Sequence, residues 1–214
     1  MLAVESGQRE SKESWGVVLR DLRQRGLEPW RGTIADGVLG LWAALGEQYP
    51  DLAEQRCWNH KLVNVLDALP SKHQATASAL LRAMPYAQSQ AECEALRDQF
   101  ITRYQVLAPK AVERLHDDWE WLVTFYRFPQ EHWGHLRTTN IVASPFATVR
   151  LRTTAANRFK RVENATAVIW KLLQVAESSF RRRKGAELLP AVYAGAQYVD
   201  GLRHSTRTPQ RMAA

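Results

Sequence analysis

The chain has 214 residues, of which 45% are hydrophobic and 24% are charged, with a net charge of +7, as expected of one large globular domain or two small ones. No apolar run approaches the roughly 20 residues of a membrane-spanning helix, and the first residues lack the basic flank and apolar core of a signal peptide, which indicates a cytoplasmic protein with no membrane partner. The two cysteines, Cys57 and Cys93, are too few for a disulfide framework in a chain of this size.

The first 70 residues predict an alternation of short strands and helices, which is typical of an α/β unit. We expect strands at residues 1–5, 32–35 and 55–58. Apolar residues recur at helical spacing between these strands, first before Gly26 and again from Leu41. A third helix must end at Pro70, because proline cannot donate to the helical hydrogen-bond ladder.

From about residue 72 to residue 135 the sequence predicts helices alone, with Pro109 and Pro129 as breaks. Two further helices are expected at about residues 144–153 and 164–183, and a short one at about 188–198. The predicted fold class is therefore α/β, mostly α. We divide the chain into a strand–helix unit, a helical segment, a basic helical segment and a frayed polar tail, at residues 1–70, 71–136, 137–201 and 202–214.

The positive charge is concentrated in one stretch of the chain. Residues 137–184 hold 11 lysines and arginines and only two acidic residues, whereas the rest of the chain holds 18 basic and 20 acidic residues. A local excess of this kind is the usual footprint of a nucleic-acid partner. Part of it has an alternative interpretation, because Arg181–Lys184 followed by Gly185 is also typical of the basic last turn and glycine stop of a helix.

Three groups of residues are candidates for metal chemistry. Asp36 follows a predicted strand, where α/β sheets present ligand-binding groups, although such a residue alone is more often part of a turn. Cys57 and His60 have a spacing that suits two zinc ligands, but no second pair has matching spacing, so packing or hydrogen bonding is favoured. The acidic group around Asp117 and Asp118 lies in a helical pattern and predicts a solvated face.

Several motifs, in order along the chain, together resemble the Mutator-type family of bacterial insertion-sequence transposases. They are Arg9–Trp15, Asp36–Gly37, Gln55–Lys61, Asn64–Pro70, Phe128–Asn140, Arg137–Arg150 and Val162–Ala167. The resemblance extends from Met1 to about Gly201. It implies an RNase H-like core with a helical insertion, in which two aspartates and a glutamate bind two Mg²⁺ ions for DNA cleavage and strand transfer. It also implies that insertion-element ends are the DNA partner and that the transposase forms homo-oligomers.

By this resemblance Asp36 matches the family's second aspartate, and Ala143 stands where the family has its glutamate. The first aspartate belongs to a strand upstream of residue 1. An alanine cannot bind Mg²⁺, which requires oxygen ligands, so we expect an incomplete RNase H-like core and an inactive C-terminal portion of a transposase, with no productively bound Mg²⁺. A glutamate at position 143 could instead have served in a capping box, but Ser144 and Pro145 offer an equally natural start to a helix.

DNA binding is expected through the basic residues of the third segment, near a site where Asp36 lies within reach of the Ala143 backbone. Arg150 follows Ala143 by seven residues, two helical turns, so a helix that spans both would point them the same way. The DNA-binding candidates are Arg137, Arg150, Arg152, Arg158, Lys160 and Arg161. An alternative from a different class is a non-catalytic DNA-binding protein that regulates full-length transposase by mixed association.

Overall fold

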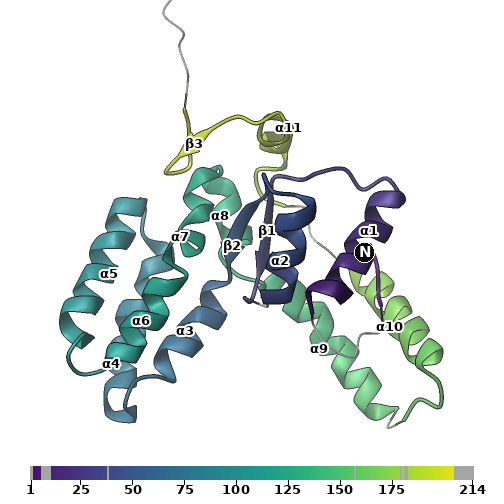
Figure 1. Cartoon of the computed structure of the whole chain (residues 1–214), viewed down its shortest axis with the longest axis horizontal. Coiled ribbons are helices and arrows are strands. Elements are labelled where there is room, and N and C mark those ends of the chain that lie inside the picture. The colour runs from purple at the N-terminus through teal and green to yellow at the C-terminus, as the bar shows by residue number, and fades with distance from the viewer. Residues whose placement is uncertain are drawn as a thin grey trace, which may run out of the picture.

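The computed structural model describes residues 2–5, 11–37, 39–156, 158–178, 180 and 183–204, and within this part it describes the backbone but not the side chains of residues 141–144. The described part is mostly helical with a few short strands, as the fold class predicted. Figure 1 shows three regions: a small α/β unit, a helical body on one side of it, and a pair of helices on the other.

The α/β unit consists of two parallel strands joined by a crossover helix. Strand β1 (Gly32–Ala35) pairs with β2 (Ala53–Arg56) in the register Gly32↔Ala53 to Ala35↔Arg56, and α2 (Leu39–Gln48) connects them. Helix α1 (Lys12–Gln24) starts at a capping box formed by Ser11 and Ser14 and packs on α2. The shared core of this unit consists of Leu19, Ala44, Leu45 and Tyr49.

Two predicted strands differ from the observed structure. Residues 2–5 form no strand with any other described part of the chain. The strand expected at residues 55–58 ends at Arg56, and Trp58 already begins α3 (Trp58–Leu66). The indole Nε1 of Trp58 donates to the carbonyl of Leu122 at 2.8 Å, and its backbone N–H donates to the carbonyl of Arg137 at 3.0 Å. These long-range contacts turn the chain into a helix where the local pattern favours a strand.

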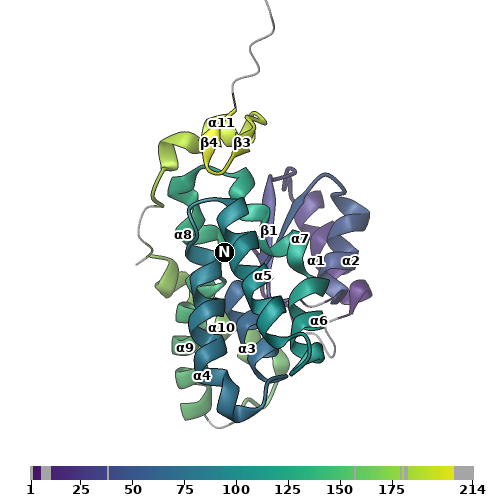
Figure 2. The ribbon, with the colours of Figure 1, turned by 90° about the vertical axis from the view of Figure 1, so that its left-hand side faces the viewer.

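The helical body follows, and residues 72–135 contain only helices, 3-10 turns and loops, as predicted. One continuous core, from Trp58 to Trp133, lies between its elements, which Figure 2 shows side by side. Its helices are α3, α4 (Ser71–Ala83), α5 (Gln90–Tyr104), α6 (Pro109–Asp117), α7 (Trp119–Leu122) and α8 (Trp133–Leu136), with 3-10 turns at Met84–Tyr86, Thr124–Arg127 and Gln130–His132.

Two long helices form a hairpin on the other side of the α/β unit. Helix α9 (Asn140–Ala155) packs against α10 (Val162–Glu177), and Figure 1 shows the pair projecting away from the helical body. The helix predicted to begin at about residue 144 therefore begins four residues earlier, with Pro145 inside it. No helix among the described residues is both long and apolar enough to cross a bilayer.

The chain then returns to the top of the helical body through a 3-10 turn (Ala186–Leu188), α11 (Leu189–Tyr193) and a hairpin of β3 (Tyr198–Val199) with β4 (Leu202–Arg203). The sequence predicted a helix and a frayed tail in this region. The hairpin instead docks on the body, where Asp200 Oδ1 accepts from the backbone N–H of Gln90 at the start of α5, at 2.7 Å. The remainder of the predicted tail lies outside the described residues.

Candidate functional site at the carboxyl edge of the sheet

Asp36 lies immediately after the carboxyl end of β1, as predicted, and its side chain is exposed. The backbone N–H of Cys57 donates to the carbonyl of Ala35 at 2.8 Å, so the chain leaving β2 stays paired with the residue before Asp36. Gly37 follows with a φ of +96°, a left-handed conformation that an L side chain rarely adopts. This turn holds the Asp36 carboxylate at the edge of the sheet.

Cys57 also brings the start of α9 to the same edge. Its Sγ accepts from the backbone N–H of Thr139 at 3.4 Å and lies 3.4 Å from the Thr139 hydroxyl. Two residues further on, Asn59 Nδ2 donates to Asn140 Oδ1 at 2.9 Å. These contacts begin α9, whose fourth residue is Ala143, at the edge that carries Asp36. They also explain why the helix starts before the predicted Ser144–Pro145 cap.

Cys57 and His60 are arranged as a packing residue and a surface residue. The Cys57 side chain is completely buried, whereas His60 is exposed on α3. No group of three or more histidine, cysteine, aspartate or glutamate side chains in the described part of the chain is placed to hold a metal ion. Cys57 contacts Thr139 through its sulfur and Ala35 through its backbone N–H.

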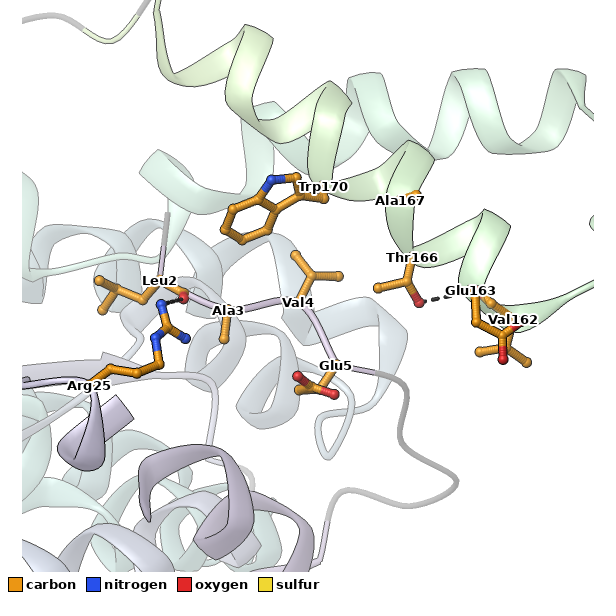
Figure 3. Close-up of a pocket in the computed structure, with 10 residues that line it drawn as sticks. All are labelled: Leu2, Ala3, Val4, Glu5, Arg25, Val162, Glu163, Thr166, Ala167 and Trp170. Atoms are coloured by element: carbon orange, nitrogen blue, oxygen red, sulfur yellow. Dashed lines mark hydrogen bonds between the residues drawn. The ribbon is translucent and has the colours of Figure 1, made fainter. Parts of the chain in front are cut away.

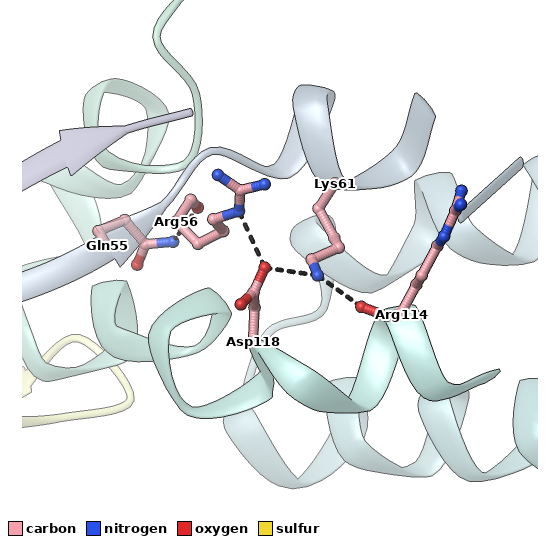
Figure 4. Close-up of polar contacts among 5 residues, drawn as sticks. All are labelled: Gln55, Arg56, Lys61, Arg114 and Asp118. Carbon is pink, nitrogen blue, oxygen red and sulfur yellow. Dashed lines mark hydrogen bonds and ion pairs between the residues drawn. The ribbon is translucent and has the colours of Figure 1, made fainter. Parts of the chain in front are cut away.

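A charged cluster behind the Asp36 turn went unrecognised in the sequence (Figure 4). Arg56, at the end of β2, is 8% exposed, and its Nε donates to Asp118 Oδ2 at 3.0 Å. Lys61 is also buried, and its Nζ lies 2.5 Å from the same Asp118 oxygen and 2.5 Å from the carbonyl of Arg114. The prediction of a solvated face is thus wrong for Asp118, because this carboxylate faces two buried cations.

Neighbouring Gln55 fixes β2 to the helical body. It is 3% exposed, its Nε2 donates to the carbonyl of Leu122 at 3.0 Å, and its Oε1 accepts from the backbone N–H of Phe125 at 2.7 Å. Nε2 also lies 2.8 Å from the carbonyl of Arg56. Both residues belong to the Gln55–Lys61 motif, but neither was proposed as a site residue from the sequence, where both look like ordinary polar strand residues.

The carboxylates near this edge do not fit a site for two Mg²⁺ ions. Asp36 supplies one carboxylate, Ala143 supplies none, and Asp118 is already paired with Arg56 and Lys61. Mg²⁺ prefers several oxygen ligands in nearly octahedral geometry, and two such ions close together need bridging carboxylates. Among the described residues at this edge, Asp36 thus offers a single carboxylate position, which is too few for two such ions.

The structure separates Arg137 from the other predicted DNA-binding residues. Its Nη1 donates to the carbonyl of Pro85 at 2.5 Å, and its guanidinium lies over the Tyr86 ring at 4.5 Å from the centroid. Burial lowers the pKa of Arg137 from its usual value, a further sign of an environment shared with protein atoms. Arg137 therefore contributes to packing at the base of α9.

The other five candidates are exposed on the α9–α10 hairpin. Arg150 and Arg152 lie in α9, and Arg158, Lys160 and Arg161 lie in the connection to α10. Two of them therefore lie toward the end of α9 and three in the connection at the far end of the hairpin. We refer to these five residues as the basic hairpin.

A separate pocket of about 520 Å³ lies between the N-terminal segment and α10 (Figure 3). Arg25 lines it and donates through Nη2 to the carbonyl of Leu2 at 2.8 Å, while Trp170 faces it from α10. The pocket contains none of the residues that the sequence singled out for function. It is lined by Leu2, Ala3, Val4, Glu5, Arg25, Val162, Glu163, Thr166, Ala167 and Trp170.

Comparison with known proteins gives a consistent result along the chain. Residues 1–183 match the family described as "Transposase, Mutator family". The chain is 41% identical to the transposase for insertion sequence element IST2 of Acidithiobacillus ferrooxidans, over 98% of this chain and 71% of that protein. It is 39% identical to the IS6120 transposase of Mycolicibacterium smegmatis, over 94% and 62%, and 32% identical to the ISRM5 transposase of Rhizobium meliloti, over 79% and 42%. The chain thus spans only part of the length of these relatives, and it belongs to the Mutator family of transposases.

Proposed function

We propose that this chain functions in DNA transposition, as the part of a Mutator-family transposase that binds DNA next to the Asp36 edge. The relatives named above are transposases of insertion sequences, which supports DNA as the substrate class. The observation that carries the proposal is the position of the basic hairpin: Cys57 fastens the start of α9 to the strand end at Asp36. DNA held by these cations would lie along α9, whose start is fastened to the edge that presents the carboxylate.

The finer proposal concerns the catalytic core. We infer that β1, α2 and β2 belong to an RNase H-like core and that Asp36 is the second aspartate of a metal-binding set, as the family resemblance implies. In an intact site Asp36, together with two further carboxylates, would hold Mg²⁺, which supplies electrostatic stabilisation for phosphoryl transfer. Because Ala143 offers no oxygen ligand, we propose that this polypeptide on its own neither cleaves nor joins DNA.

A non-catalytic role in the same process is the second candidate. The lack of a carboxylate at position 143 favours it, since a chain that binds element ends without cutting them would compete with, or associate with, an active transposase. Both candidates share DNA binding by the basic hairpin. They differ in whether any metal-dependent cleavage can be restored by changing this chain, and homo-oligomer formation is a prediction common to both.

DNA binding is tested by titrating a labelled duplex at salt concentrations between about 50 and 200 mM. Wild-type protein should lose affinity steeply with salt, because each neutralised phosphate releases counterions. A triple variant with Arg150, Arg152 and Arg161 changed to glutamine should bind more weakly with a slope reduced by about 3. Lys110→Gln, which removes an exposed cation from α6 in the helical body, is the matched control and should bind like wild type. Equal slopes for the triple variant and the control would contradict the proposal.

Cleavage is tested with the same duplexes, carrying insertion-element ends, in Mg²⁺ or Mn²⁺. Wild type should give no product, and Ala143→Glu alone should give none either, because Asp36 and the introduced glutamate would still be short of a full ligand set for two ions. Cleavage by the wild-type chain that Asp36→Asn abolishes would show that the assignment of its metal ligands is wrong.

A further inference from the structure

A buried cation with an unused hydrogen-bond donor lies against the Asp36 turn. Arg56 Nη1 is buried and has no hydrogen-bond partner among the described residues, although Nε of the same guanidinium is bonded to Asp118. A buried N–H without an acceptor costs free energy, and more so on a charged group. An arginine at this position, in place of an apolar residue, therefore calls for a ligand that completes its hydrogen bonds.

The guanidinium is directed at the turn that carries Asp36. A Cβ added to Gly37 would overlap the Cζ and Nη1 atoms of Arg56, so the planar group lies directly against the backbone of Gly37. Gly37 is part of an irregular turn with positive φ, and Asp36 beside it is exposed. Access to Nη1 from the edge that presents the Asp36 carboxylate would require a displacement of Gly37.

The charge of the cluster also indicates an anion. Arg56 and Lys61 share one oxygen of Asp118, and the Lys61 ammonium completes its contacts with the carbonyl of Arg114 (Figure 4). Two buried cations against one carboxylate leave a net charge of +1. Burial of an uncompensated charge is costly, and an incoming phosphate would compensate it with the paired oxygens that suit an arginine.

We propose that Arg56 binds a phosphate group of the DNA backbone at the Asp36 edge, with Asp118 and Lys61 as positioning residues that hold its guanidinium in place. This inference rests on the proposed function, since it assigns one phosphate contact of the same DNA to the sheet edge rather than to the basic hairpin. It places that phosphate next to the carboxylate expected to serve chemistry in an intact site. Arg56 thus differs from the five hairpin cations, which are solvent-exposed and reach DNA without any rearrangement.

The first experiment measures thermal unfolding in inorganic phosphate against chloride at matched ionic strength. Phosphate should raise the melting temperature of wild type by about 3 °C more than that of Arg56→Gln at concentrations well above its dissociation constant, because the general stabilising effect of phosphate acts on both proteins. Asp118→Asn should melt lower in chloride but gain more from phosphate than wild type does, because both cations then lack their carboxylate. Lys110→Gln should behave like wild type.

The Asp118→Asn result separates ligand binding from a purely structural role of the cluster. If Arg56→Gln does not fold, a phosphate shift of Asp118→Asn larger than that of wild type still supports the inference. A shift equal to or smaller than that of wild type overturns it, since a structural ion pair predicts only a loss of stability. A folded Arg56→Gln whose phosphate shift equals that of wild type would overturn it as well.

The second experiment repeats the DNA titration with Arg56→Gln and Lys110→Gln. Loss of one phosphate contact should reduce the salt slope by about 1 and weaken binding roughly eightfold at 0.1 M salt. If wild type binds DNA and Arg56→Gln has the slope of Lys110→Gln, the inference fails while the proposed function stands. If phosphate stabilises the protein but no DNA binds at any salt concentration, the proposed function fails and the ligand of Arg56 is free phosphate rather than DNA.

Discussion

Replacement of Gln55 by alanine should destabilise the protein far more than the same replacement of an exposed polar residue. The variant leaves the backbone N–H of Phe125 without its acceptor in a region where Phe125 is completely buried. An unpaired buried donor costs about 1–3 kcal/mol, and the lost packing of the side chain adds about 1 kcal/mol. The carbonyl of Leu122 still accepts from the indole N–H of Trp58, so the loss of its hydrogen bond from Gln55 adds little to the destabilisation. We expect a total of about 2–4 kcal/mol.

Urea unfolding followed by circular dichroism measures this change, and the melting temperature should fall by about 5–15 °C. Gln105→Ala is the control, because Gln105 is exposed at the end of α5, and it should change the free energy of unfolding by less than about 0.5 kcal/mol.

Gln55→Glu tests the direction of the hydrogen bonds. It keeps an acceptor for Phe125 but places an oxygen against the carbonyls of Leu122 and Arg56, so it should be tolerated only when protonated. A Gln55→Ala variant as stable as Gln105→Ala would refute the role of Gln55 as the tie between β2 and the helical body.

Three further predictions use titratable groups. Burial and the nearby Arg183, His132 and Lys184 lower the pKa of His135, whose Nε2 accepts from the backbone N–H of Lys184. The contribution of His135 to stability is therefore present above about pH 6.5 and is lost as pH falls through the lower folded pKa. In unfolding experiments at several pH values, His135→Gln should flatten this acid dependence, whereas His116→Gln, at an exposed position, should not. Burial raises the pKa of Glu54, so its contribution to stability is fully present below about pH 4.3 and is lost as pH rises through the higher folded pKa. Glu54→Gln should therefore stabilise the protein at pH 7 and give no gain at pH 3 in the same assay. Burial raises the pKa of the Cys93 thiol to about 12, so a thiol reagent at pH 8 should modify Cys93 only after unfolding, and rapid modification of the folded protein would contradict its position in the core.

The local pattern of the sequence predicts the position of Asp36 well. A short apolar run, an aspartate and a glycine suffice to predict a strand end and a turn, and the pairing of β1 with β2 agrees with this local pattern. The all-helical character of residues 72–135 follows from the same kind of information. In both cases hydrophobic spacing and proline positions decide the local structure, and tertiary packing agrees with them.

The sequence does not predict the features that depend on residues far away along the chain. Asp118 looks like a surface residue until β2 brings Arg56 beside it, 62 residues away in sequence. Arg137 belongs to a basic stretch, but Tyr86 and Pro85 of the helical body contact it. The β3–β4 hairpin did carry a signal, because Asp200–Gly201 is a typical two-residue hairpin turn and both residues have positive φ.

Cys57 links the strand end at Asp36 to the start of α9 through two hydrogen bonds. Its N–H is bonded to the strand that ends at Asp36 and its sulfur to the start of α9, and the Asn59–Asn140 hydrogen bond supports the same arrangement. Neither contact requires a metal ion. The edge can therefore keep its geometry, and DNA can be bound along it, even though Ala143 removes a ligand. For this reason we expect the loss of catalysis and the retention of DNA binding to be separable properties of this chain.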